Sequence, residues 1–159
     1  MSTTSTTSPL RTPNAILSIF VGGLIAGALD LTAAYIIYGV GVPRGIAAGM
    51  LGRAALQGGS VVYALGIALH FFIACSAATI YFAASRKLEF MVLHPLVSGV
   101  FYGIAIYLVM NLIVLPLSAL HLKGPYRLES LIQGLLIHMF LIGLPIALSV
   151  RQFGRSSPG

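Results

Sequence analysis

The sequence predicts an all-α integral membrane protein, a bundle of four transmembrane helices with a short interfacial helix between the first two spans. Three observations support this fold class. The chain of 159 residues is 58% hydrophobic and 8% charged, whereas soluble domains carry about 25% charged residues. Its four apolar runs each reach the length of about 20 residues that a helix needs to cross a hydrocarbon core roughly 30 Å thick. Each run also contains one strongly polar residue near its middle.

Each apolar run defines one span of a single transmembrane domain over residues 14–150. The spans are expected at residues 14–40, 60–84, 94–120 and 128–150. Residues 1–13 are rich in Ser and Thr, so we expect a disordered polar tail there, and residues 151–159 form a second short polar tail. Because proline kinks or ends helices, we expect that effect at Pro116 and Pro145.

The connection between the first two spans differs from the others. Residues 43–57 are too short and too polar to cross a membrane; they begin at Pro43, which suits a first helical turn, and precede Gly58, which suits a stop. We expect a short helix that lies at the membrane interface or dips between the spans. It is either an amphipathic connector or an element that gates or contacts a substrate. The side chains expected to face inward are Ile46, Met50, Leu51 and Ala54.

The polar residues within the spans are the candidate functional site. They are Asp30, His70, Asn111 and His138. Counted from the end that holds the first and third connections, they lie about 7 to 10 residues deep, so at about 1.5 Å per residue their levels agree within roughly 5 Å. An ionisable side chain at membrane depth is costly and usually faces the bundle interior, so it indicates function. We therefore predict one intramembrane polar cluster, with Asp30 within hydrogen-bonding reach of a histidine, directly or through one water.

Glycines mark the expected helix-packing faces, because small residues let membrane helices approach closely. These glycines are Gly23, Gly27, Gly66, Gly99, Gly103 and Gly134. Helical periodicity places each ionisable residue on the small-residue face of its own helix. A faint internal repeat relates residues 66–72 to residues 134–140, and the first glycine pair to the pair at 99 and 103. The repeat predicts two hairpins of the same orientation, an arrangement found in transporters.

Several roles are open for the polar cluster. A carboxylate and two imidazoles could pass protons or handle a small solute. A b-type haem could be held by His70 and His138, since the glycine one turn before each would leave space for a porphyrin. A metal site of two His and Asp30 is chemically reasonable, but no spacing singles it out and none is expected. In the simpler roles, Asp30 is a neutral acid bonded to a carbonyl, the histidines are hydrogen-bonded core residues, and Asn111 bonds between helices.

Other function classes are disfavoured. The net charge of +6 comes from basic residues that lie singly or in pairs at helix ends, where they meet lipid headgroups, and no basic stripe with interleaved aromatics suggests nucleic-acid binding. No HExxH, GxSxG, P-loop or Cys pair is present, so no catalytic residues are assigned. The main alternative to solute or proton handling is an accessory protein that packs through its glycine faces against another membrane protein or a second copy.

A family resemblance rests on a series of residues between His70 and Leu120. They are His70, Tyr81, Arg86–Lys87, His94–Pro95, Gly99, Gly103, Met110 and Pro116. Their order resembles the central hairpin of the YagU-like inner-membrane proteins of bacteria, a family without an established activity. The chain differs in its shorter first loop and in the placement of Asp30. The resemblance implies a bacterial inner-membrane location and four helices, and it transfers no catalytic residue.

Charge and aromatic residues predict how the bundle sits in the membrane. The paired Arg86–Lys87 and the Arg151 at a helix end favour termini on the cytoplasmic side. Tyrosines near the span ends suit an interfacial aromatic belt. These tyrosines are Tyr35, Tyr38, Tyr63, Tyr81 and Tyr126.

Overall fold

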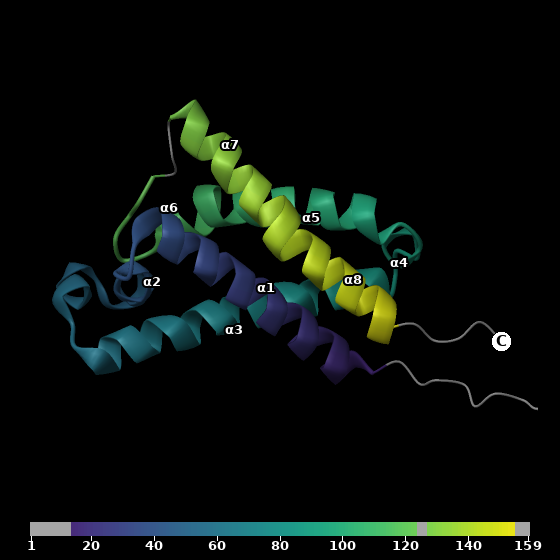
Figure 1. The fold of residues 1–159 in the computed structure, drawn as a ribbon, viewed down its shortest axis with the longest axis horizontal. Coiled ribbons are helices and arrows are strands. Elements are labelled where there is room, and N and C mark those ends of the chain that lie inside the picture. Colours follow the sequence, from purple (N-terminus) through teal and green to yellow (C-terminus); the bar gives the residue numbers. More distant parts are fainter. Residues whose placement is uncertain (1–13, 124–126, 155–159) are drawn as a thin grey trace, which may run out of the picture.

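Four long apolar helices make up most of the chain in the computed structural model, which describes residues 14–123 and 127–154 (Figure 1). The first span is α1 (Ala15–Tyr38) and the second is α3 (Ser60–Ser85). The third span combines α5 (Pro95–Val109), the π-helical segment η2 (Met110–Val114) and α6 (Leu115–Leu117). The fourth combines α7 (Leu128–Ile137), the π-helical segment η3 (His138–Gly143) and α8 (Leu144–Phe153). The chain is therefore a multi-pass, all-α membrane protein, and the predicted four-helix bundle is confirmed.

Local sequence signals explain where the spans begin and end. Asn14 caps α1, because its side-chain oxygen accepts a hydrogen bond from the Leu17 amide at 3.0 Å. The same helix ends at Gly39, whose φ of +80° is a conformation that glycine adopts without strain. The third span begins at Pro95, where the missing amide donor has no cost in a first helical turn.

A proline closely follows each π-helical segment. The segment η2 ends two residues before Pro116, and η3 ends two residues before Pro145. Proline removes one helical hydrogen bond and its ring clashes with the carbonyl one turn earlier, and a widened π turn moves that carbonyl away. In the fourth span, the helix consequently continues past Pro145 to Phe153. The third span ends at Leu117, one residue after Pro116.

Different helical elements lie at the two ends of the bundle. In Figure 1, α2 and α6 lie at one end of the bundle, and the start of α1, the end of α8 and α4 (Phe90–Leu93) lie at the other. At this second end, the Asn14 amide donates to the Phe153 carbonyl at 3.0 Å, and the Ser149 hydroxyl donates to the Ser18 carbonyl at 2.9 Å. These bonds join α1 to α8.

The buried core lies towards the end of the bundle that holds the start of α1 and the end of α8. Its members are Ala26, Ala77, Ala78, Tyr81, Met91, Ile142, Ile146, Ala147 and Val150. Tyr81 was expected in an interfacial belt, but its side chain is fully buried. Its hydroxyl donates to the Met91 carbonyl at 3.0 Å and lies 2.8 Å from the Ser98 hydroxyl. These partners satisfy the polar tip of Tyr81, and its ring can therefore fill the core.

The segment between the first two spans forms α2 (Val42–Leu51) and a 3-10 turn, η1 (Arg53–Gln57). The α2 helix packs against α3, where the Pro43 carbonyl oxygen occupies the space in which a side chain at position 66 would lie. The predicted inward face is wrong in part, since Leu51 is more than half exposed and Ala54 is exposed too. The small residues Pro43, Ala47 and Ala48 are buried instead, because the contact with α3 is too close for larger side chains.

Candidate functional site

A cavity of about 510 Å³ lies between the spans, in the half of the bundle nearer α2 and α6. All four spans, α2 and the connection after α6 contribute to its lining, which is mostly aliphatic. Asp30 of α1, His70 of α3 and His138 at the start of η3 all line it. From α2, Ile46 and Met50 line the same cavity, so their side chains contact a hollow space instead of a packed core. The structure thus brings three of the predicted polar residues to one site.

His70 links α3 to α1. Its Nε2 lies 2.8 Å from the Gly27 carbonyl oxygen, and since a carbonyl only accepts, Nε2–H is the donor. The same nitrogen lies 4.0 Å from the Asp30 carboxylate, which is beyond a direct hydrogen bond. The side chains of His70 and Asp30 are 13% and 20% exposed. The Asp30 carboxylate therefore lines the cavity beside the imidazole and makes no direct hydrogen bond to it.

His138 is held by its own helix. Its Nδ1 lies 2.9 Å from the Gly134 carbonyl oxygen and donates to it, and its ring meets the Tyr107 ring edge-on, with centroids 5.3 Å apart. In the neutral imidazole the other nitrogen, Nε2, is then the acceptor. No buried side-chain nitrogen or oxygen lacks a partner within residues 14–123 and 127–154. Nε2 makes no hydrogen bond there and so keeps some accessible surface, and His138 as a residue lines the cavity.

Asn111 lies outside this site. Its amide donates to the Tyr107 carbonyl at 2.9 Å, four residues earlier in the same helix, and it is not among the residues that line the cavity. The expected bond between helices is therefore replaced by a bond within one helix. The physical reason is its position in η2, where the π turn alters the direction of side chains relative to a regular helix.

In the first hairpin, the predicted glycines allow α1 and α3 to approach closely. A Cβ atom at Gly23 would lie 2.8 Å from the Cα atom of Cys75, and one at Gly27 would lie 2.9 Å from the ring of Phe71. Both distances are shorter than normal contacts between carbon atoms. The short separation between the helices lets the His70 side chain reach the Gly27 carbonyl.

In the second hairpin, the predicted glycines face the fourth span. A Cβ at Gly103 would overlap the His138 carbonyl, and one at Gly99 would lie 3.0 Å from the Gly143 carbonyl oxygen. Gly143, in η3, faces Gly99 in return, since a Cβ there would overlap the Gly99 carbonyl. Backbone therefore meets backbone along this interface, which is the closest approach that two helices can make.

The space proposed for a porphyrin is filled. Pro43 of α2 occupies the notch at Gly66, and the Tyr107 ring occupies the notch at Gly134, 2.5 Å from where a Cβ would lie. The glycine before each cavity histidine thus serves packing within the chain. In the described ranges no group of three or more His, Cys, Asp and Glu side chains is placed to hold a metal ion. What the site offers is one carboxylate and two imidazoles in an apolar cavity, a set that can bind polar donors and exchange protons.

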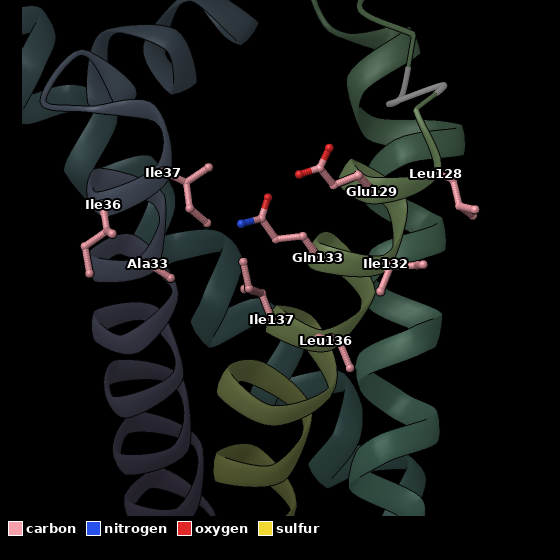
Figure 2. A pocket seen from close by; sticks show the side chains of 9 residues that line it. All are labelled: Ala33, Ile36, Ile37, Leu128, Glu129, Ile132, Gln133, Leu136 and Ile137. Carbon is pink, nitrogen blue, oxygen red and sulfur yellow. The ribbon is translucent and has the colours of Figure 1, made fainter.

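A second hollow, which the sequence analysis did not identify, lies between α1 and α7. Figure 2 shows the Glu129 and Gln133 side chains pointing from α7 towards Ile37 of α1. This open groove has a volume of about 770 Å³, and the rest of its lining is aliphatic. Glu129 and Gln133 are four residues apart and so share one helix face. That spacing was the available sequence signal.

No family model matches the chain, and no curated protein or solved structure is significantly similar to it. The resemblance to the YagU-like proteins stays a prediction.

Proposed function

We propose that the chain handles a small solute or protons through the Asp30, His70 and His138 side chains in a bacterial inner membrane. The observation that carries the proposal is that these three ionisable residues, from three different spans, line one mostly aliphatic cavity. A concave, mainly apolar pocket with a few convergent polar groups is the usual form of a small-molecule site. Ionisable groups at membrane depth are costly, and their convergence on a cavity favours a functional role.

The three side chains would have different tasks. The hydrogen bond from His70 to the Gly27 carbonyl holds the imidazole in place. His70 would therefore stay fixed and orient the nearby Asp30 carboxylate. Asp30 would accept a hydrogen bond or a positive charge from the solute. His138 would accept a second bond, or a proton, at its accessible Nε2, while the aliphatic lining covers the apolar body of the solute.

Cytoplasmic termini belong to the same proposal. The Arg86–Lys87 turn and Arg151 lie at the end of the bundle that holds the start of α1 and the end of α8, and positive residues favour the cytoplasmic side. The cavity then lies in the outer half of the membrane. Reporter fusions at positions 88 and 124 should give cytoplasmic and external signals respectively, and the reverse result would invert the orientation.

The test of function is proton flux into vesicles that contain the purified full chain. We expect a potential-driven flux above that of protein-free vesicles, and we expect Asp30→Asn to reduce it to the protein-free rate. Glu89→Gln is the matched control because it also removes one acid but lies in the turn after α3, away from the cavity. Flux in Asp30→Asn equal to wild type would refute a role for the carboxylate.

If the wild-type protein moves no protons, the solute part of the proposal is tested separately. A panel of small amines and alcohols is screened for stabilisation of the detergent-solubilised protein against heat. Stabilisation by a compound that is lost when Asp30 or His138 is substituted supports the solute site. Stabilisation of both substituted proteins to the same extent as the wild type contradicts it.

The accessory-protein alternative has less support. It relied on glycine faces being free for another protein, and every glycine predicted for packing, from Gly23 to Gly134, instead faces a neighbour within the chain.

A further inference from the structure

The groove between α1 and α7 exists because the first turns of the fourth span diverge from α1. The η3 and α8 parts of that span pack against α1, whereas α7 makes no extensive contact with α1, and none of its residues is buried. Figure 1 shows α7 diverging from α1 towards the end of the bundle that holds α2 and α6. The divergence begins at the π turn of η3, and such bulges redirect helices. The groove is thus open to the lipid.

The groove combines an apolar floor with polar groups at one end only. Ala33, Ile36 and Ile37 line it from α1, and α7 adds aliphatic side chains of similar size. Glu129 lies in the first turn of α7, and Gln133 lies one turn deeper, about 6 Å further along the helix axis. A ligand that fits has a long apolar part, a hydrogen-bond acceptor about one turn above it, and a charged head beyond.

Glu129, which lines the groove, and Arg127 beside it indicate what that head carries. The Arg127 guanidinium lies 3.4 Å from the Glu129 carboxylate, and both side chains are more than four-fifths exposed. A cation and an anion side by side complement a head that carries a phosphate and an ammonium. Arginine suits the phosphate, and the carboxylate suits an ammonium that still has N–H donors.

We propose that this groove binds a phospholipid with an ethanolamine headgroup. Its ammonium would donate to Glu129, its phosphate would contact Arg127, an ester carbonyl would accept from the Gln133 amide, and one acyl chain would lie along α1. A choline head has no N–H donor for Glu129. A glycerol head is anionic overall and would place no positive charge there.

The experiment uses native mass spectrometry of the purified full chain, released from detergent with an equimolar mixture of ethanolamine, choline and glycerol phospholipids that share the same acyl chains. We expect the ethanolamine lipid to be retained about threefold over the choline lipid, the size expected for one exposed ion pair. Glu129→Gln should remove this preference. Glu89→Gln, the same change at the opposite end of the bundle, should keep it.

A third variant tests the groove itself. Ala33→Phe fills the floor and should lower retention of all three lipids, with folding checked by circular dichroism and by a monodisperse elution profile. Equal retention of the lipids by the wild type, or an unchanged preference in Glu129→Gln, overturns the proposal. A dimer signal that Ala33→Phe removes would instead assign the groove to a second copy of the chain. None of these results depends on solute or proton movement.

Discussion

In the hairpin of α1 and α3, the His70 imidazole donates across the interface to the Gly27 carbonyl, whereas in the hairpin of the third and fourth spans the His138 imidazole donates to Gly134 of its own helix. The glycine and histidine spacing is the same in both. What differs is the contact with the glycine on the facing helix. The His70 side chain reaches Gly27, whereas the His138 backbone, and not its side chain, meets Gly103. One spacing therefore gives a bond between helices in one hairpin and a close backbone contact in the other.

The difference follows from what fills the notch before each histidine. Pro43 fills the notch at Gly66 from outside the hairpin, through α2, while Tyr107 fills the notch at Gly134 from within the hairpin. The Tyr107 ring then contacts the His138 ring. The contact with the Tyr107 ring and the bond from Nδ1 to the Gly134 carbonyl fix His138 against its own helix, and the residue lines the cavity.

The largest expected effect tests the two glycine interfaces. A leucine at position 103 would meet helix backbone that cannot move aside, whereas a leucine at position 27 would meet the edge of the Phe71 ring and a methyl group. Overpacking costs about 1–3 kcal/mol, so we expect Gly103→Leu to lower the free energy of unfolding by about 3 kcal/mol and Gly27→Leu by about 1 kcal/mol. Unfolding in mixed detergent micelles measures both.

Gly41→Leu is the control for this comparison, because nothing lies within 4 Å of a Cβ at that position. A wild-type stability for Gly103→Leu would mean that the third and fourth spans are not in close contact.

Hydropathy and helical periodicity predict much of this architecture and less of its detail. The spans follow from apolar length, and depth counting brings Asp30, His70 and His138 to one level because helix rise is constant. Asn111 was misassigned because the π turn of η2 breaks the regular periodicity used to place it. The buried face of α2 was misassigned because a backbone contact with Gly66 selects small residues, which a search for large apolar side chains overlooks.

The groove between α1 and α7 was missed for a different reason. It depends on the direction that α7 takes after η3, and a helical wheel of α7 alone contains no information about that direction. The polar pair of Glu129 and Gln133 could have been noticed, but its partner surface on α1 could not.

The second prediction compares the two histidines. His70→Phe removes a hydrogen bond between helices, which in membrane proteins contributes about 0.6 and at most about 1.7 kcal/mol. His138→Phe removes only a bond within one helix and keeps an aromatic contact with Tyr107, so we expect its stability within about 0.5 kcal/mol of wild type. The same micelle unfolding measures both variants. An equal loss in the two variants would contradict the assigned difference in bonding.

The smallest expected effect concerns the Asp30 carboxylate, which lines the same cavity as the two histidines. The Asp30 carboxylate lies 4.0 Å from the Nε2 atom of His70. Within the described ranges, neither ring nitrogen of His138 comes that close to the carboxylate. Asp30→Asn should leave the fold intact and change the side-chain nitrogen chemical shifts of His70 more than those of His138, because the field of a charge weakens with distance. Nitrogen-15 NMR of the histidine-labelled protein in micelles measures both, with Glu89→Gln as the control that should change neither. A response confined to His138 would mean that the Asp30 carboxylate interacts with His138 and not with His70. The roles proposed for the two histidines in the cavity would then have to be exchanged.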